Sequence, residues 1–202
     1  MKSYHHGNLK EELVNCAVNM CERDGYTKLS IRSLAKESNV SQTAPYRHFK
    51  TKQELYAAVA KEGFDKLNKK MSSIKPTDQK KYLVACGKTY INFGLKNANT
   101  YDLMFGTAVG SFTDYQDLVD SANSLFELLR SSFSKLSNES EEIISFKCIT
   151  LWSMVHGLVG IIRKVNVIGD INQNMGPMPF ANEIANNIDE HLDKVISGII
   201  KN

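Results

Sequence analysis

Apolar residues recur along most of the chain at steps of three and four positions, the spacing of one face of an α-helix. No stretch shows the alternation typical of a half-buried strand. The pattern therefore predicts an all-α protein. The predicted helices cover residues 8–24, 30–38, 41–50, 51–71, 81–96, 101–105, 115–136, 141–168 and 180–200.

The stretch 30–50 combines two short helices with a sharp turn between them. Ser30 is placed to cap the first helix, and Ser41 is placed to cap the second. Asn39 lies between them, and Asn tolerates the left-handed backbone that such a turn needs. A helix, a tight turn and a polar second helix predict a helix-turn-helix, which places its second helix in the major groove of DNA.

The second helix has an inward and an outward side. Tyr46 and Phe49 are three positions apart, so we expect both to anchor this helix to a small core. Thr51 is expected to cap the next helix, with Glu54 in the position that completes a capping box.

Polar side chains take the outward positions of the second helix, namely Gln42, Thr43, Arg47 and Lys50. Near the start of a recognition helix, such side chains meet base edges. We expect Gln42 to pair with adenine, Arg47 to pair with guanine, and the Thr43 methyl group to contact thymine.

Three segments resemble the DNA-binding domain of TetR-family transcriptional regulators: Leu29-Ser-Ile-Arg-Ser-Leu-Ala, Val40-Ser and Tyr46-Arg-His-Phe-Lys-Thr-Lys-Gln-Glu-Leu55. The resemblance covers roughly residues 8 to 70. Pro45 departs from the common pattern of the family, and a proline at this depth removes a backbone hydrogen bond.

The resemblance implies a double-stranded DNA operator as partner and a role for further residues. Ser30, Tyr46, His48 and Lys52 would contact phosphates, and Arg32 would contact a base or a phosphate. A solvated polar residue is the alternative for each. The implied organisation is a three-helix helix-turn-helix domain at 1–50, a connecting fourth helix at 51–71, and a helical ligand-binding and dimerisation domain at 77–202.

The charge is divided unevenly along the chain. Residues 1–70 carry 13 Lys or Arg against 8 Asp or Glu, whereas residues 71–202 carry 12 against 14. The positive excess therefore lies in the part that holds the helix-turn-helix, which agrees with a phosphate partner.

The segment 141–168 is apolar nearly all round the helix, so we expect it to be buried on every side. One chain of this size covers only part of such a helix, and a second copy would cover the rest. The helix at 180–200 has a narrower apolar stripe. Two such helices from each of two subunits predict a four-helix homodimer interface, which is also where the family places its dimer contact.

Tyr101-Asp-Leu-Met-Phe105 and Trp152-Ser-Met-Val-His-Gly157 together resemble a recurring C-terminal domain of this family. We expect a small-molecule effector to bind in this half. The candidate pocket residues are Tyr90, Phe93, Met104, Phe105, Trp152 and His156. Plain core packing is the alternative for each of them, His156 included.

Several function classes find no support. The chain shows no paired carboxylates with a base, no nucleophile motif and no phosphate loop, so we expect no enzyme and no cofactor. The adjacent His5 and His6 have no Cys or carboxylate near them in sequence and make a poor metal site. Four cysteines without metal or redox spacing indicate reduced thiols and a cytoplasmic protein. We find no signal peptide and no run of membrane-spanning length.

Two interpretations therefore remain. The first is a dimeric repressor that a small-molecule ligand releases from an inverted-repeat operator. The alternative is a ligand-independent DNA-binding factor in chromosome structure or cell division. One operator beside its own gene would favour the first, and many scattered sites would favour the second.

Overall fold

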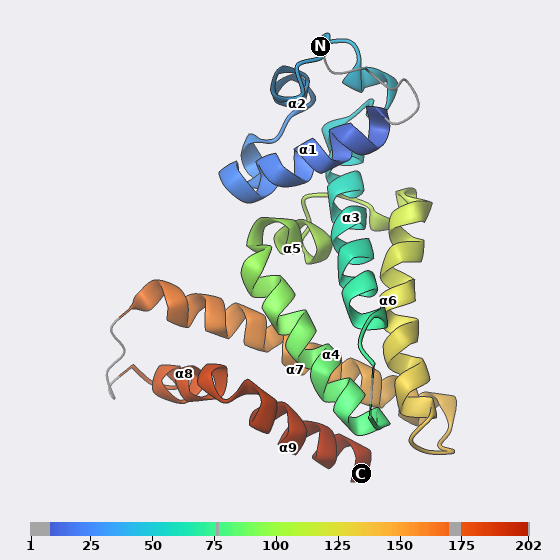
Figure 1. Cartoon of the computed structure of the whole chain (residues 1–202), viewed down its shortest axis with the longest axis vertical. Helices are drawn as coiled ribbons and strands as arrows, with labels where there is room; N and C mark the ends of the chain where they lie inside the picture. Colours follow the sequence, from blue (N-terminus) through green and yellow to red (C-terminus); the bar gives the residue numbers. More distant parts are fainter. Residues whose placement is uncertain (1–8, 76, 170–174, 202) are drawn as a thin grey trace. The chain divides into compact units, whose positions relative to one another are not determined.

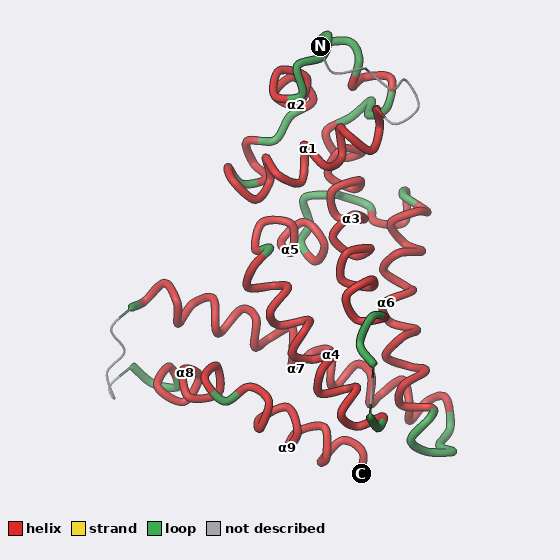
Figure 2. Tube along the Cα trace, in the orientation of Figure 1, coloured by secondary structure: helices red, strands yellow, loops and turns green. Residues whose placement is uncertain are grey.

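The computed structural model describes residues 9–75, 77–169 and 175–201, and these form helices joined by loops (Figure 2). The all-α prediction is confirmed. His5, His6 and Asn8 lie outside the described residues. The α-helices are α1 (Leu9–Asp24), α2 (Ile31–Glu37), α3 (Lys52–Ser72), α4 (Gln79–Lys96), α5 (Ala98–Phe105), α6 (Gln116–Ser134), α7 (Glu141–Ile168), α8 (Met178–Asn186) and α9 (Ile188–Lys201). Three short 3-10 helices are η1 (Tyr26–Lys28), η2 (Pro45–Arg47) and η3 (Phe112–Asp114).

The chain divides into two compact units, and each is discontinuous in sequence. The first unit comprises residues 1–66 and 97–123, and the second comprises residues 67–96 and 124–202. Helices α3 and α6 each contribute residues to both units.

The core of the first unit forms where α1 packs on α2 and on α5 (Figure 1). Leu13, Ala17 and Cys21 are fully buried on the inner face of α1. Leu34 on α2 and Leu55 on α3 are also fully buried. The buried side chains of α1, α2 and α3 thus contribute to one core in this unit.

In the second unit α4 packs against both α7 and α9, and α8 packs against α7 (Figure 1). Leu192 of α9 lies against the backbone of α4 at Gly87, where an added Cβ would be 3.1 Å from the Leu192 Cδ2 atom. Ion pairs border this contact: Lys80 Nζ lies 2.7 Å from Asp193 Oδ1, and Lys88 pairs with Asp189.

Helix α7 buries only one of its faces within the chain, which agrees with the expectation that one chain covers only part of this helix. Among its large apolar side chains, Phe146 is 73% exposed and Val167 is 85% exposed. Ile143, Ile149, Trp152 and Ile161 are exposed as well. The buried face consists of Ile144, Lys147, Cys148, Leu151, Val155, Leu158, Val159, Ile162 and Val165.

By length and composition α7 is apolar enough to cross a membrane, so the expectation that no run has this length was wrong. Length and apolar composition alone are weak evidence for a membrane-spanning helix, because the core helix of a soluble protein shares both properties. Its buried face makes α7 part of the core of the second unit.

Lys147 lies on the buried face of α7 and is only 5% exposed. Its Nζ atom donates to Glu139 Oε1 at 2.9 Å and to the Ile200 carbonyl at 3.4 Å. Hydrogen bonds from Lys147 and then Ser137 hold the pKa of Glu139 below its usual value. The buried ammonium group of Lys147 is therefore paired with the Glu139 carboxylate. Such pairing offsets the cost of removing a charge from water.

The predicted last helix is broken into α8 and α9. At the break, the Asn187 backbone N–H donates to the carbonyls of Glu183 and Ile184, both at 3.1 Å. The Asn187 side chain also donates to the Glu183 carbonyl at 3.1 Å. An Asn side chain competes in this way for backbone partners, which ends the helix.

Candidate nucleic-acid interface

The start of α2 is fixed by two serines. Ser33 N–H donates to Ser30 Oγ at 3.0 Å, and Ser30 N–H donates to Ser33 Oγ at 2.9 Å. This reciprocal pair is a capping box, with Ser in the place of the usual Glu. The predicted cap at Ser30 is confirmed, and Arg32 is held exposed in the first turn of the helix.

The turn after α2 has the predicted left-handed residue, because Asn39 has φ 52°. Val40 N–H donates to the Ala35 carbonyl at 3.1 Å, and Asn39 N–H donates to the Lys36 carbonyl at 3.2 Å. These two bonds form a Schellman motif, which reverses the chain tightly.

The second helix of the motif is shorter than predicted. Gln42 and Thr43 lie in a turn, and only Pro45–Arg47 is helical, as the 3-10 helix η2. Ser41 was expected to cap this helix, but its hydroxyl lies 3.2 Å from the Thr43 hydroxyl and Ala44 takes the N-cap position. Pro45 carries no N–H for an α-helical bond to Ser41, which accounts for the late start.

The anchor of this segment also differs from the prediction. Phe49 is buried as expected, whereas Tyr46 is 44% exposed. Pro45 is the buried partner instead, and Phe49 N–H donates to its carbonyl at 2.9 Å. Tyr46 is therefore displayed beside Arg47 rather than packed in the core.

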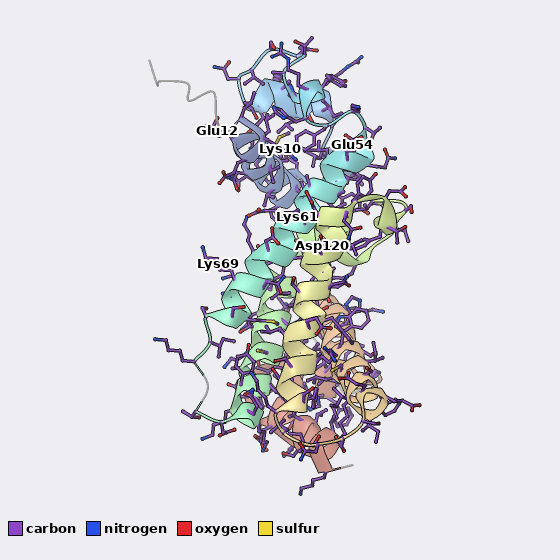
Figure 3. The ribbon with its side chains drawn as sticks, turned by 90° about the vertical axis from the view of Figure 1, so that its right-hand side faces the viewer. Lys10, Glu12, Glu54, Lys61, Lys69 and Asp120 are labelled. Carbon is purple, nitrogen blue, oxygen red and sulfur yellow. The ribbon has the colours of Figure 1, made fainter. Side chains whose placement is uncertain are left out.

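Helix α3 begins where predicted. Glu54 N–H donates to Thr51 Oγ1 at 3.1 Å, so Thr51 is the cap. The Glu54 carboxylate accepts from the Lys50 N–H at 2.7 Å rather than from Thr51. Figure 3 shows Glu54 near the beginning of α3 and Lys69 toward its other end.

Lys52 is positioned by residues that the sequence analysis missed. Its Nζ atom donates to the Thr27 carbonyl at 3.3 Å and lies 5.1 Å from the centre of the Tyr56 ring. The Tyr56 hydroxyl donates to the Tyr26 carbonyl at 2.6 Å. Only the four-residue spacing of Lys52 and Tyr56 on one helix could have indicated part of this arrangement.

The basic side chains of the helix-turn-helix are not neutralised by acidic residues in the described part of the protein. Among the residues that the structure describes, Arg32, Arg47, Lys50 and Lys52 are exposed and form no ion pair. Arg23 behaves differently, because it pairs with both Asp24 and Glu37 at 2.8 Å. Cations that are not neutralised by a carboxylate of the protein are suited to phosphates.

All nine predicted DNA-contact residues thus lie in one stretch of the first unit. Arg32, Gln42, Thr43, Tyr46, Arg47, Lys50 and Lys52 are exposed, and Ser30 and His48 are half-buried. The His48 ring packs beside the Phe49 ring at 6.4 Å. The individual contacts of these residues with DNA stay predictions.

Three of the six predicted pocket residues form a network in the second unit. The Trp152 indole N–H donates to the Tyr90 hydroxyl oxygen at 3.1 Å, and this oxygen lies 3.2 Å from His156 Nδ1. Burial lowers the pKa of His156, which favours its neutral form. Phe93 is buried in the same unit.

The other two, Met104 and Phe105, belong to the first unit. Phe105 packs against the rings of Phe64 at 5.3 Å and Tyr101 at 4.8 Å. Met104 is buried beside Gly63. Effector contact by any of the six stays a prediction.

Two family models match the chain. The model described as "Bacterial regulatory proteins, tetR family" matches residues 10–59, and "Tetracyclin repressor-like, C-terminal domain" matches residues 83–167. Together they span about two thirds of the sequence. No curated protein matches the chain.

Solved structures share the fold at low sequence identity. A Rhodococcus sp. RHA1 protein of unknown function is 21% identical with a TM-score of 0.75, over 96% of this chain and 98% of its own. A TetR variant from Acinetobacter baumannii AYE in complex with minocycline is 16% identical with a TM-score of 0.64, over 94% of both chains. BioQ, solved with its double-stranded DNA operator, is 18% identical with a TM-score of 0.62, over 96% of this chain and 98% of its own.

The matches to both parts of the chain describe regulators rather than enzymes. A helix-turn-helix with exposed basic residues in the first unit agrees with them. The chain belongs to the TetR family and is a DNA-binding transcription regulator.

Proposed function

We propose that the protein is a cytoplasmic, dimeric repressor that binds an inverted-repeat operator and is released from it by a small molecule. The observation that carries the proposal is the set of exposed basic residues without ion pairs on the helix-turn-helix. BioQ, of the same fold, is bound to its operator, and the Acinetobacter baumannii relative holds minocycline. We assign DNA recognition to residues 1–50, with the connecting helix at 51–71, and effector binding and dimerisation to residues 77–202.

On the operator, we assign Gln42, Thr43 and Arg47 to bases. Gln42 would pair with adenine, Thr43 would contact a thymine methyl group, and Arg47 would pair with guanine. The assigned phosphate contacts are Ser30, Tyr46, His48, Lys50 and Lys52, and Arg32 takes a base or a phosphate. Lys52 suits its role because the Thr27 carbonyl and the Tyr56 ring already hold its side chain in place.

The exposed apolar face of α7 supports the dimer. Phe146 on α7 and Phe180 on α8 are 73% and 69% exposed, and large apolar side chains left in water mark interaction sites where they gather into a patch. We propose that α7 with α8 and α9 forms an isologous interface with a second copy, which sets two helix-turn-helix motifs about one turn of DNA, roughly 34 Å, apart.

For the effector, we propose contacts with Tyr90, Phe93, Trp152 and His156. Their aromatic surface suits an apolar molecule, and the hydrogen-bond network offers it polar groups. Contacts of the effector with Met104 and Phe105 stay a prediction from the sequence.

The operator test begins with duplexes that the full-length protein selects from genomic DNA. Arg47→Ala should cost about 1–3 kcal/mol of binding and relax one operator position. Lys52→Ala should weaken all sequences alike and reduce the salt slope by about 1. Lys69→Ala is the matched control, because Lys69 is exposed near the far end of the same helix (Figure 3).

Identical binding profiles for the Arg47 and Lys52 variants would contradict the division between base and phosphate contacts. Selection of many scattered sites without a consensus would favour a ligand-independent structural factor instead. For the dimer, Phe146→Asp should convert a particle of twice 22.7 kDa into single chains in sedimentation, whereas Ser131→Asp, at an exposed position of α6, should not.

A further inference from the structure

In the first unit, the last turn of α1 and the first turn of α5 supply each other's missing hydrogen-bond partners. The Thr100 N–H of α5 donates to the Glu22 carboxylate of α1 at 2.8 Å. In return, the Asn99 side chain of α5 donates to the Glu22 backbone carbonyl at 3.2 Å. Helix ends leave such amides and carbonyls without partners inside the helix, so each helix caps the other.

The Thr100 side of this contact is shielded from water. Thr100 is only 2% exposed, so its N–H cannot readily exchange Glu22 for solvent. The carboxylate also lies at the positive end of the α5 dipole, where a negative charge is favoured. Moving α5 away from α1 therefore leaves a buried donor without its acceptor.

On another side, α5 is seated directly against α3 within the same unit. A Cβ at Gly63 would lie 2.6 Å from Met104 Sδ and 2.7 Å from Thr100 Cγ2. Only glycine permits so close an approach of the two helices. Because α5 is fitted to both α1 and α3, a shift of α5 must change its contact with α1.

The residue next to Glu22 contacts the helix-turn-helix. The adjacent Arg23 donates to Glu37, the last residue of α2, at 2.8 Å. The left-handed turn at Asn39 follows immediately. At this same end of α5, only Asn97 separates it from α4, the helix that carries Tyr90 and Phe93.

We infer that the mutual cap between Glu22 and the first turn of α5 is the regulatory contact that links the position of α5 to the helix-turn-helix. The inference rests on the proposed function, because it concerns how operator binding and the effector-dependent part of the chain influence each other. Arg23 and Glu37 extend this contact to the end of α2.

Thermodynamic reciprocity provides a test without the effector. If the position of α5 alters operator binding, operator binding must alter the stability of α5 to the same degree. The test is to measure amide hydrogen exchange of the full-length protein with and without the tightest-binding duplex selected from a randomised library. In the wild type, this duplex should slow exchange in Thr100–Phe105 by about 5-fold or more.

Glu22→Ala should reduce this slowing to less than about 2-fold while α2 is still protected by the duplex. Asn99→Ala removes only one of the two bonds and should give a partial loss. Glu12→Ala is the matched control, because it removes an exposed carboxylate from the same helix and leaves the cap intact (Figure 3).

The outcomes separate the two proposals. Protection of α2 without any change in α5 in the wild type overturns the regulatory contact and leaves the proposed function standing. Full slowing of α5 exchange in both cap variants also overturns it. If no duplex protects α2, the proposed function fails and the inference fails with it. Should Glu22→Ala not fold, Asn99→Ala decides, since unchanged coupling in that variant contradicts the role of the cap.

Discussion

The part of the first unit assigned to DNA is built from short elements whose ends are tied by side chains, whereas the second unit relies on long helices that bury apolar faces. The two serines at positions 30 and 33, the turn at Asn39 and the cap at Thr51 fix the helix-turn-helix within about twenty residues. In the second unit, α4, α7 and α9 meet across long stretches of sequence.

The difference fits the role that we propose for each part. Base recognition needs a few side chains at defined positions, and local hydrogen bonds set the backbone that carries them. The proposed effector binding and dimerisation would need apolar surface in the second unit, part of it buried and part of it left for a partner. Each of the following variants tests one side of this contrast.

The largest effect is expected in the second unit. Leu192 is fully buried, so Leu192→Ala leaves a cavity against α4 and should lower the free energy of unfolding by about 3 kcal/mol. Urea denaturation measures the change. Val195→Ala on the same helix is the control, because Val195 is only half-buried and should cost less. Equal losses would show that burial does not govern this unit.

The next effect concerns close packing in the first unit. Gly63→Val would place its side chain within the space of Met104 and Thr100, and we expect a loss of about 2 kcal/mol in unfolding free energy. Gly157→Val is the comparison, because a Cβ at Gly157 meets no described atom within 4 Å. A Gly63 variant as stable as the wild type would show that α5 moves away without cost.

A smaller effect should follow from loss of a cap. Ser30→Ala removes the hydroxyl that accepts from Ser33 and should cost about 1 kcal/mol in a thermal or urea unfolding experiment. Ser41→Ala removes a hydroxyl that caps no helix and should change stability by less than about 0.5 kcal/mol. The reverse order would restore the sequence-based expectation for Ser41.

The smallest effect is a pH dependence from His156. Burial lowers the pKa of this imidazole in the folded protein, so the unfolded chain binds the proton more readily. The contribution of His156 to stability is therefore complete above its unfolded pKa, about 6.5, and is lost as the pH falls below that value. His156→Gln should make the free energy of unfolding, measured by urea denaturation, depend less on pH between 7.5 and 5.5 than in the wild type. An unchanged pH dependence would show that His156 is not its source.

The features predicted correctly were those that a few neighbouring residues decide. Ser30, Asn39 and Thr51 act on backbone groups within five positions, so their roles follow from the order of residues alone. The start of the second helix failed for a local reason as well, because the missing N–H of Pro45 outweighed the capping tendency of Ser41.

The features that escaped prediction depend on partners distant in sequence. The Glu22 carboxylate meets an amide 78 residues away, and Lys147 reaches a carbonyl 53 residues away. Neither residue type indicates such a partner, since an acidic residue on a helix is usually solvated and a lysine is rarely buried. The break at Asn187 was missed because the apolar stripe continues across it.

The interleaved boundaries of the two units matter for anyone who wishes to exchange operator specificity between regulators of this family. A chimera joined once, after α3, would transplant the helix-turn-helix but leave behind residues 97–123, which belong to the same unit. Glu22 would then face a foreign α5. A successful graft should therefore carry both segments from the same parent.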